Sequence, residues 1–351
     1  MNFKKWLKII LVLFLGIFII GFVVVPLPYY VEAPGATINL KELITVNGKK
    51  DQESGSFSLT SVGVRQATGY LAVKAKLSPF EDLISAEELT GGATNEEYNQ
   101  IQRYYMESSQ NAAIEQALKL AGLPYKMEFK GVYVMSIEKN SSFYGKLAVG
   151  DTVTRINGQT FKSAEDFMKY VKSKKVGEKV TITYLHAGKE KEASGKLIEL
   201  LTDKKAGIGI TLTDHTAIQT KTNVSINSGS IGGPSAGLMF TLEIYEQVTG
   251  KNLRHGKEIA GTGTITSEGE VGRIGGIDKK VASADQAGVE IFFAPDDPIS
   301  VEVKKEYPEI QSNYEEAKAA AKKLNTTMKI VPVKTVQDAL NYLEKMNETK
   351  E

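Results

Sequence analysis

The chain has 351 residues, enough for two or three domains, and its 43 basic and 42 acidic side chains give a net charge of +1. This balance excludes a strongly basic phosphate-binding surface, so no nucleic-acid partner is expected. Cysteine is absent and only three histidines occur, which excludes disulfides, thiol nucleophiles and thiolate metal sites. We expect no metal, no cofactor and no histidine-based catalytic triad.

The N-terminus carries an uninterrupted apolar run, Ile9–Val25, between a lysine-rich start and the Pro26-Leu27-Pro28 stretch. Its length suits a short membrane-spanning helix, and Trp6, Tyr29 and Tyr30 supply aromatic residues at both ends. A cleaved signal peptide and a buried core helix are the alternatives, but no A-x-A site closes the run. The sequence therefore predicts a retained single-pass anchor. The preceding lysines place the N-terminus in the cytoplasm and the rest of the chain outside the cell.

The next segment alternates short apolar stretches with turns. Residues 55–62 and 68–77 are predicted as strands, and the polar stretch 90–100 as a loop that leads into a helix. Residues 105–122 have the spacing of that helix, and Gly122 with Pro124 would end it.

Residues 127–200 predict a compact order of strand, short turn, strand, helix and two strands. Within them, the stretch 145–159 reads GKLAVGDTVTRINGQ. It resembles the PDZ domains associated with bacterial peptidases, although an ordinary hairpin turn would also explain the INGQ part. The resemblance implies that a peptide adds as a strand to an exposed sheet edge. The loop expected to hold its terminal carboxylate is Gly131, Val132, Tyr133 and Val134.

Residues 231–237 read IGGPSAG, a glycine-rich corner in which Pro234, Ser235 and Ala236 are predicted to open a helix that reaches about residue 249. Glycines let another backbone approach closely, and a helix start offers free backbone N–H groups. A serine becomes a nucleophile only when a base takes its proton. Taken alone, the corner is explained equally well as an ordinary helix start.

A base is available in the stretch 259–295. Lys280 lies near Ile274, Ile277 and Val281 in the sequence, and burial among apolar residues lowers the pKa of an amine towards neutrality. A lysine considered alone is usually a solvated helix residue, so the assignment depends on both stretches together.

Together, the two stretches resemble the proteolytic domain of Lon-family (S16) serine peptidases, which use a serine–lysine pair. The resemblance implies that Ser235 is the nucleophile, that Lys280 is the general base and that Thr262 supports the lysine. Many Lon relatives carry an acidic residue at the position where this chain has Gly232. The backbone expected at the oxyanion site is that of Gly233, Pro234 and Ala236.

The helix at 105–122 is also similar to a helix in the first half of the Lon proteolytic domain. We therefore expect an α+β protein with an N-terminal transmembrane helix and a PDZ domain inserted in the proteolytic domain; a serial order, with the PDZ domain preceding it, is the alternative.

The predicted end of the chain is helix (313–324), strand and helix. The expected divisions are a cytoplasmic tail (1–8), the anchor (9–27), a linker (28–50), the first proteolytic part (51–122), the PDZ domain (123–202), the main proteolytic part (203–345) and a tail (346–351).

No G-x-x-x-x-G-K-[ST] motif occurs, so no nucleotide partner is expected. Across residues 1–345 the chain resembles the membrane-anchored PDZ–Lon serine peptidases of Gram-positive bacteria, the SepM/YlbL type. That implies ATP-independent endoproteolysis of small secreted or membrane-tethered peptides and proteins, such as a peptide pheromone, captured by the PDZ domain. The alternative function is a non-catalytic PDZ adaptor or chaperone for exported peptides. Hexameric rings are usual for Lon domains, so a homo-oligomer is one option.

Overall fold

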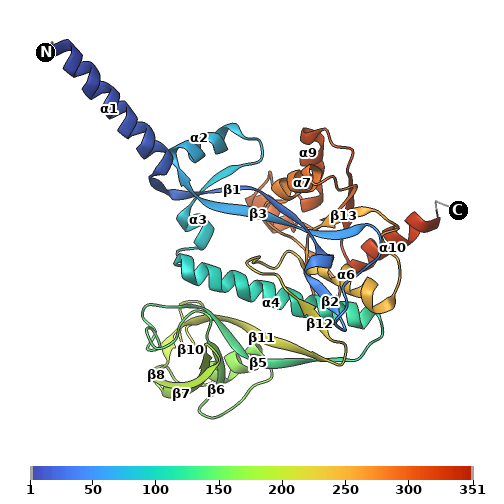
Figure 1. Cartoon of the computed structure of the whole chain (residues 1–351). Helices are drawn as coiled ribbons and strands as arrows, with labels where there is room; N and C mark the ends of the chain where they lie inside the picture. Colours follow the sequence, from blue (N-terminus) through green and yellow to red (C-terminus); the bar gives the residue numbers. More distant parts are fainter. Residues whose placement is uncertain (1–2, 349–351) are drawn as a thin grey trace.

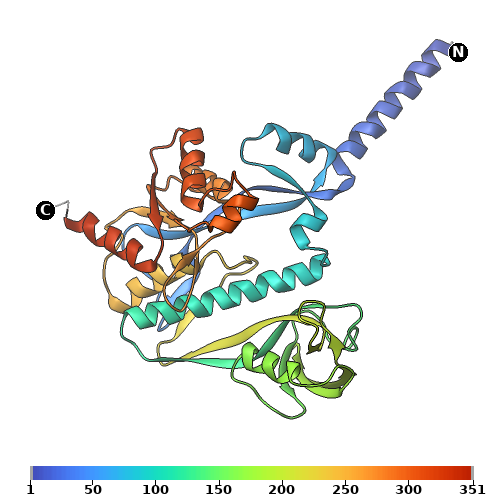
Figure 2. The same cartoon turned by 180° about the vertical axis from the view of Figure 1, so that it is seen from behind.

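The computed structural model describes residues 3–348 (Figure 1). Helix α1 (Phe3–Val24) contains the predicted anchor and projects away from the rest of the molecule, as both views show (Figures 1 and 2). Its span Lys5–Val24 has a mean hydropathy of 3.0, and none of it is buried against the protein. The helix is therefore long and apolar enough to cross a membrane.

A six-stranded mixed sheet forms the centre of the larger body, in the order β17-β16-β13-β3-β1-β4. Strands β1, β3 and β4 pair antiparallel, whereas β3, β13, β16 and β17 pair in parallel. The strands are β1 (Pro26–Asn39), β3 (Ser56–Thr68), β4 (Asp82–Ser85), β13 (Glu258–Gly261), β16 (Ile291–Pro295) and β17 (Lys329–Val333). The sheet thus combines strands from the first third of the chain with strands from the last third.

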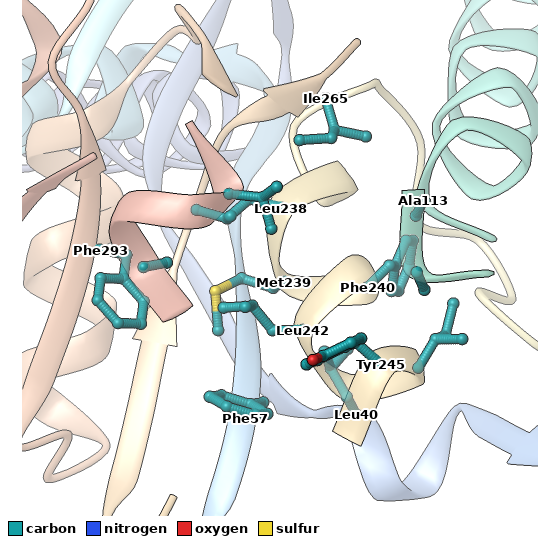
Figure 3. Close-up of a cluster of buried hydrophobic side chains, with 14 of the residues drawn as sticks. Leu40, Phe57, Ala113, Leu238, Met239, Phe240, Leu242, Tyr245, Ile265 and Phe293 are labelled. Atoms are coloured by element: carbon teal, nitrogen blue, oxygen red, sulfur yellow. The ribbon is translucent and has the colours of Figure 1, made fainter. Parts of the chain in front are cut away.

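Helices cover both faces of this sheet, because its buried strands alternate apolar side chains between the two faces. On one face lie α4 (Asn95–Leu120), α6 (Gly237–Thr249) and α10 (Val336–Glu348). Figure 3 shows α6 there, with Leu238, Met239 and Leu242 among the side chains that fill the core. On the other face, α7 (Ile277–Gln286) and α9 (Asn313–Leu324) pack against Ala260, Phe292 and Ala294.

The smaller elements complete this body. They are η1 (Leu40–Glu42), α2 (Gly69–Leu77), α3 (Ala86–Thr90) and α8 (Val301–Glu306), with the two-stranded pairs β2 (Ile44–Val46)/β12 (Val224–Ile226) and β14 (Thr264–Ile265)/β15 (Val271–Gly272).

The second body is a five-stranded sheet in the order β11-β5-β6-β7-β8 with its own core. Its strands are β5 (Tyr125–Ile137), β6 (Thr152–Ile156), β7 (Lys179–His186), β8 (Lys189–Lys196) and β11 (Ile210–Thr220). Helix α5 (Ala164–Lys172) packs on it through Phe167 and Val171. The small pair β9 (Ile198–Glu199)/β10 (Ala206–Gly207) lies between β8 and β11 along the chain.

Three expectations about the chain's divisions are wrong. The predicted linker 28–50 contains β1, which pairs with β3 and β4 inside the large sheet. The boundary at 202 falls too early, because β11 pairs with β5 along its whole length and so belongs to the smaller sheet. The predicted tail 346–351 begins inside α10; residues 349–351 lie outside the described residues.

The predicted strand 68–77 is also wrong, because α2 occupies it. The Thr68 hydroxyl accepts a hydrogen bond from the Leu71 backbone N–H and caps the helix at its start. Good helix formers follow, and the apolar side chains of Leu71 and Ala75 lie four residues apart on one face. The predicted C-terminal order of helix, strand and helix is confirmed by α9, β17 and α10.

Helix α4 and the β5/β11 ribbon join the two bodies (Figure 1). At one end of the ribbon, Tyr125 and Ile218 pack against the core of the larger body; at the other end, Ile210 and Leu212 pack against the core of the smaller one. The rings of Tyr104 on α4 and Tyr133 on β5 stack with their centroids 4.1 Å apart.

Candidate active site

Ser235 lies in the turn that leads into α6, half-buried beside a cleft. The helix begins at Gly237, two residues after the serine, rather than at Pro234 as the sequence suggested. Gly233 has a φ of +88°, a conformation that side-chain-bearing residues rarely adopt, so a glycine is needed to turn the chain there. The turn directs the hydroxyl towards α7.

Lys280 meets Ser235 from α7. Its Nζ lies 3.1 Å from Ser235 Oγ and 2.6 Å from the backbone carbonyl oxygen of Thr60 on β3, to which it donates a hydrogen bond. Gly276 caps α7 with a φ of +65°, and a Cβ there would come within 2.8 Å of Val62, so the glycine lets the helix start close against β3.

Burial makes the Lys280 amine a plausible base at moderate pH. Its side chain is 4% exposed, and desolvation lowers the pKa of the ammonium from 10.5 to about 8. The adjacent Lys279 is equally buried, but ion pairs with Asp82 and Asp278 outweigh the burial and raise its pKa. Two neighbouring lysines therefore have opposite shifts, and only Lys280 faces the serine hydroxyl.

Thr262 lies beside Ser235. It is fully buried, and its hydroxyl donates to the backbone carbonyl of Ser235 at 3.1 Å; the Gly263 N–H donates to the same carbonyl at 2.9 Å. The sequence suggested that Thr262 supports the lysine. Its hydrogen bond instead holds the backbone of the serine, while the Thr60 carbonyl contacts the lysine.

The predicted oxyanion residues need correction. The Gly233 N–H already donates to the carbonyl of Gln102 on α4, at 2.9 Å, and Pro234 has no N–H to offer. Ala236 is the N-cap residue of α6, a helix without a side-chain cap hydrogen bond. In the first turn of α6 the Leu238 N–H already donates to the Gly263 carbonyl at 3.1 Å, so the N–H groups of Ala236 and Gly237 are the candidate donors for an oxyanion.

Helix α4 holds the serine turn from the opposite side, a role that sequence reasoning missed. Besides the Gln102 carbonyl, Ser109 Oγ donates to the Pro234 carbonyl at 3.0 Å, and Gln110 Nε2 donates to Ser228 Oγ at 3.0 Å. The sequence pattern predicted this helix but carried no sign of which side chains face the turn.

A cleft of about 1340 Å³ opens above the dyad. Its walls come from β3, α4, the serine turn and the loop before α7. Strand β3 pairs with β13 only as far as Leu59. Beyond the Thr60 carbonyl, which accepts from Lys280, the edge of β3 on that side has no strand partner, and Ser61, Val62 and Val64 line the cleft. An unpaired strand edge presents backbone donors and acceptors to any chain that enters.

The predicted peptide-binding loop of the PDZ-like segment is wrong. Residues Gly131, Val132, Tyr133 and Val134 lie on β5, which pairs with β11 on one side and β6 on the other. A peptide cannot add to a strand with no free edge. The open edge beside α5 belongs to β11, which is the first strand of the sheet. A Gly-Ile-Gly-Ile run, 207–210, leads into that strand, and it was the sequence feature that could have pointed to this edge.

Comparison with known proteins identifies both bodies. A PDZ domain family model matches residues 109–197, and the Lon protease (S16) C-terminal proteolytic domain matches residues 191–344. The curated relatives include the Lon protease of Desulforamulus reducens, 37% identical over 92 residues (24% of this chain, 11% of that protein). The Lon protease of Anaeromyxobacter dehalogenans is 26% identical over 188 residues (52% of this chain, 22% of that protein). The chain thus spans well under half the length of these relatives.

Two solved structures are similar to part of the chain. The PDZ domain of an SdrC-like protein from Listeria monocytogenes is 42% identical, covering 25% of this chain and 92% of that one, with a TM-score of 0.24. The second domain of a Listeria protein is 46% identical, covering 24% and 86%, with a TM-score of 0.23.

The fold and the site therefore define a mixed α/β protein with two domains of known type. The chain carries a PDZ domain and a Lon-type S16 proteolytic domain, preceded by an apolar helix long enough to cross a membrane.

The Ser109→Ala variant tests the contact between α4 and the serine turn. Removing the hydroxyl leaves the half-buried Pro234 carbonyl without this donor, and the loss of one intramolecular hydrogen bond costs about 0.5–1.5 kcal/mol. Urea unfolding of the variant should show a loss of stability in that range. The exposed Ser225→Ala variant should unfold as the parent does, and equal stability of both variants would contradict the contact.

Proposed function

We propose that this protein is a membrane-anchored, ATP-independent serine endopeptidase that uses Ser235 as nucleophile and Lys280 as general base. The observation that carries the proposal is the 3.1 Å contact between the serine hydroxyl and an amine whose pKa burial lowers to about 8. Lysine in its neutral form can accept the hydroxyl proton, which a solvated lysine cannot do efficiently near neutral pH.

The proposed reaction is acyl transfer in two stages. Ser235 Oγ attacks the scissile carbonyl as its proton moves to Lys280 Nζ, and the resulting ammonium is stabilised by the Thr60 carbonyl. Backbone N–H groups at the start of α6 stabilise the oxyanion. The ammonium then gives its proton to the leaving amine, and water releases the acyl group by the reverse sequence, with Lys280 again as the base.

The cleft favours an extended polypeptide as the substrate. Its volume of about 1340 Å³ exceeds the roughly 300–1,000 Å³ of small-molecule pockets. A peptide laid along the unpaired edge of β3 would gain backbone hydrogen bonds next to Ser235. Since residues 1–351 contain no P-loop motif, we propose that substrates are already extended or locally unfolded.

The proposed location follows from α1. The lysines before the apolar run favour a cytoplasmic N-terminus, which places both domains outside the cell. Small secreted or membrane-tethered peptides are then the substrates within reach.

Replacing either dyad residue tests the proposal. Ser235→Ala and Lys280→Met should each lower kcat/KM for a peptide substrate by at least about 10³-fold, because serine and base act as a unit. Lys318→Met, which removes an exposed lysine on α9, should cleave as the parent does. Unchanged turnover in Ser235→Ala would refute the nucleophile. A folded parent that binds peptides without cleaving them would indicate the adaptor function instead.

The pH dependence follows from the sign of the lysine shift. Because the amine must be neutral, kcat/KM should rise about tenfold per pH unit below pH 7 and level off above a midpoint of about 8. Folding stability should rise with pH between about 8 and 10.5, where the unfolded chain still binds this proton and the folded chain does not. Rates independent of pH from 6 to 9 would contradict Lys280 as the base.

We propose further that the PDZ domain binds peptides at the free edge of β11, beside α5. This edge is short, because the Asp214 carbonyl accepts a hydrogen bond from Tyr104 on α4 and the Asp214 carboxylate caps α5 through the Ala164 N–H. Residues 210–213 are left for a peptide of a few residues, which suits recognition by strand addition.

Hydrogen exchange can test this assignment without a substitution. A bound peptide should slow exchange at residues 208–213 and leave 131–134 unchanged, since that stretch of β5 is already paired on both sides. Protection confined to β8, the other edge strand of the sheet, would place the peptide elsewhere.

A further inference from the structure

Helix α2 has apolar side chains on two opposite faces. On one face, Leu71 and Ala75 pack into a small core with Val31, Ala67 and Leu83. On the opposite face, Tyr70, Val73 and Leu77 are 52%, 51% and 82% exposed. A helix buried along one face normally turns polar residues to the solvent on the other, so the exposed apolar face of α2 indicates a partner surface.

The exposed residues form an ordered stripe. Positions 70, 73 and 77 follow the spacing of one helical face, and Lys74 and Lys76, both exposed, flank the stripe on its two sides. An apolar stripe between lysines is the pattern of a helix that lies in a membrane interface, where lysine stems reach outward to the headgroups.

The position of α2 in the fold selects the membrane as the partner. Helix α1 ends beside the start of α2, as both views show (Figures 1 and 2). A Cβ added at Gly69 would come within 2.3 Å of the Phe22 ring and 3.0 Å of the Phe22 carbonyl oxygen, so the last turn of α1 packs directly on the first turn of α2. The exposed stripe therefore begins on the turn of α2 that touches the end of the anchor.

We infer that α2 is a second membrane contact, in which Tyr70, Val73 and Leu77 insert into the lipid interface beside the point where α1 leaves the bilayer. The inference rests on the proposed anchoring by α1. A single helix joined to a domain would leave the domain free to tilt, whereas two adjoining contacts fix its orientation.

This contact has a consequence for catalysis, because β3 ends at Thr68, where α2 begins. The same strand carries the Thr60 carbonyl that contacts Lys280. Eight residues of strand span about 26 Å, so the dyad would lie within about that distance of the lipid surface. The cleft would thus be held where a membrane-tethered peptide can reach it.

Spin labelling can test the contact on the full chain. Because cysteine is absent, single-cysteine variants can be labelled without background. Val73→Cys probes the stripe, Ile17→Cys on α1 serves as the lipid-facing reference, and Val301→Cys on α8 serves as the water-facing reference. Each variant is placed in nanodiscs of phosphatidylcholine and phosphatidylglycerol, with one chain per disc.

The measurement is the accessibility of each label to oxygen, which concentrates in lipid, and to a water-soluble nickel chelate. The label at position 73 should shift from the water-facing value towards that of position 17. A value at position 73 equal to that at position 301 would overturn the inferred contact of α2 with lipid. If position 17 nevertheless reports lipid, the proposed anchoring by α1 is still supported. If position 17 also reports water, the anchor fails and the inference with it. Peptide cleavage measured on the same samples tests the dyad separately.

Discussion

The active site depends on one desolvated amine. Lys280 Nζ is held by a single strong backbone acceptor, the Thr60 carbonyl, and faces the hydroxyl of Ser235. Lowering its pKa from 10.5 to about 8 corresponds to roughly 3 kcal/mol against the charged form, a cost that the fold must supply from its packing. Lys280 is 4% exposed where α7 approaches β3 closely at Gly276. The adjacent Lys279 forms ion pairs with Asp82 and Asp278, and its pKa is raised instead.

The parts that assemble this site are far apart in the chain. Strand β3 and α4 precede the PDZ domain, and the serine turn and α7 follow it. Helix α4 contacts both sides: Gln102 and Ser109 hold the serine turn, while Tyr104 stacks on Tyr133 of the PDZ domain. The shared sheet and core are the physical basis for proposing that the PDZ domain is inserted in the proteolytic fold. The same arrangement puts the PDZ domain one helix away from Ser235.

Part of the candidate site could be predicted from the sequence. A glycine-rich corner with one serine and a lysine set among apolar residues marked two candidate groups, and the resemblance to the Lon proteolytic domain implied that Ser235 and Lys280 form a pair. Contacts between distant segments could not be predicted from the sequence. Thr60 and Gln102 make their contacts through backbone carbonyls, which every residue has, so their side chains give no indication of the contact. The resemblance to PDZ domains misled the prediction at 131–134, because a short loop match does not reveal strand order, and this stretch is a central strand paired on both sides. The stretch 68–77 failed because an apolar run on both faces fits a strand or a helix equally well.

The state of the amine can be measured directly. A carbon-13 NMR titration of the Lys280 Cε, assigned with the Lys280→Met variant, should give a midpoint of about 8 in the folded protein, well separated from the solvated lysines near 10.5. Replacing Ser235 by alanine should leave that midpoint low, because burial rather than the hydroxyl causes the shift. A midpoint near 10.5 would mean that the amine stays charged at neutral pH, and the account of Lys280 as the base would be contradicted.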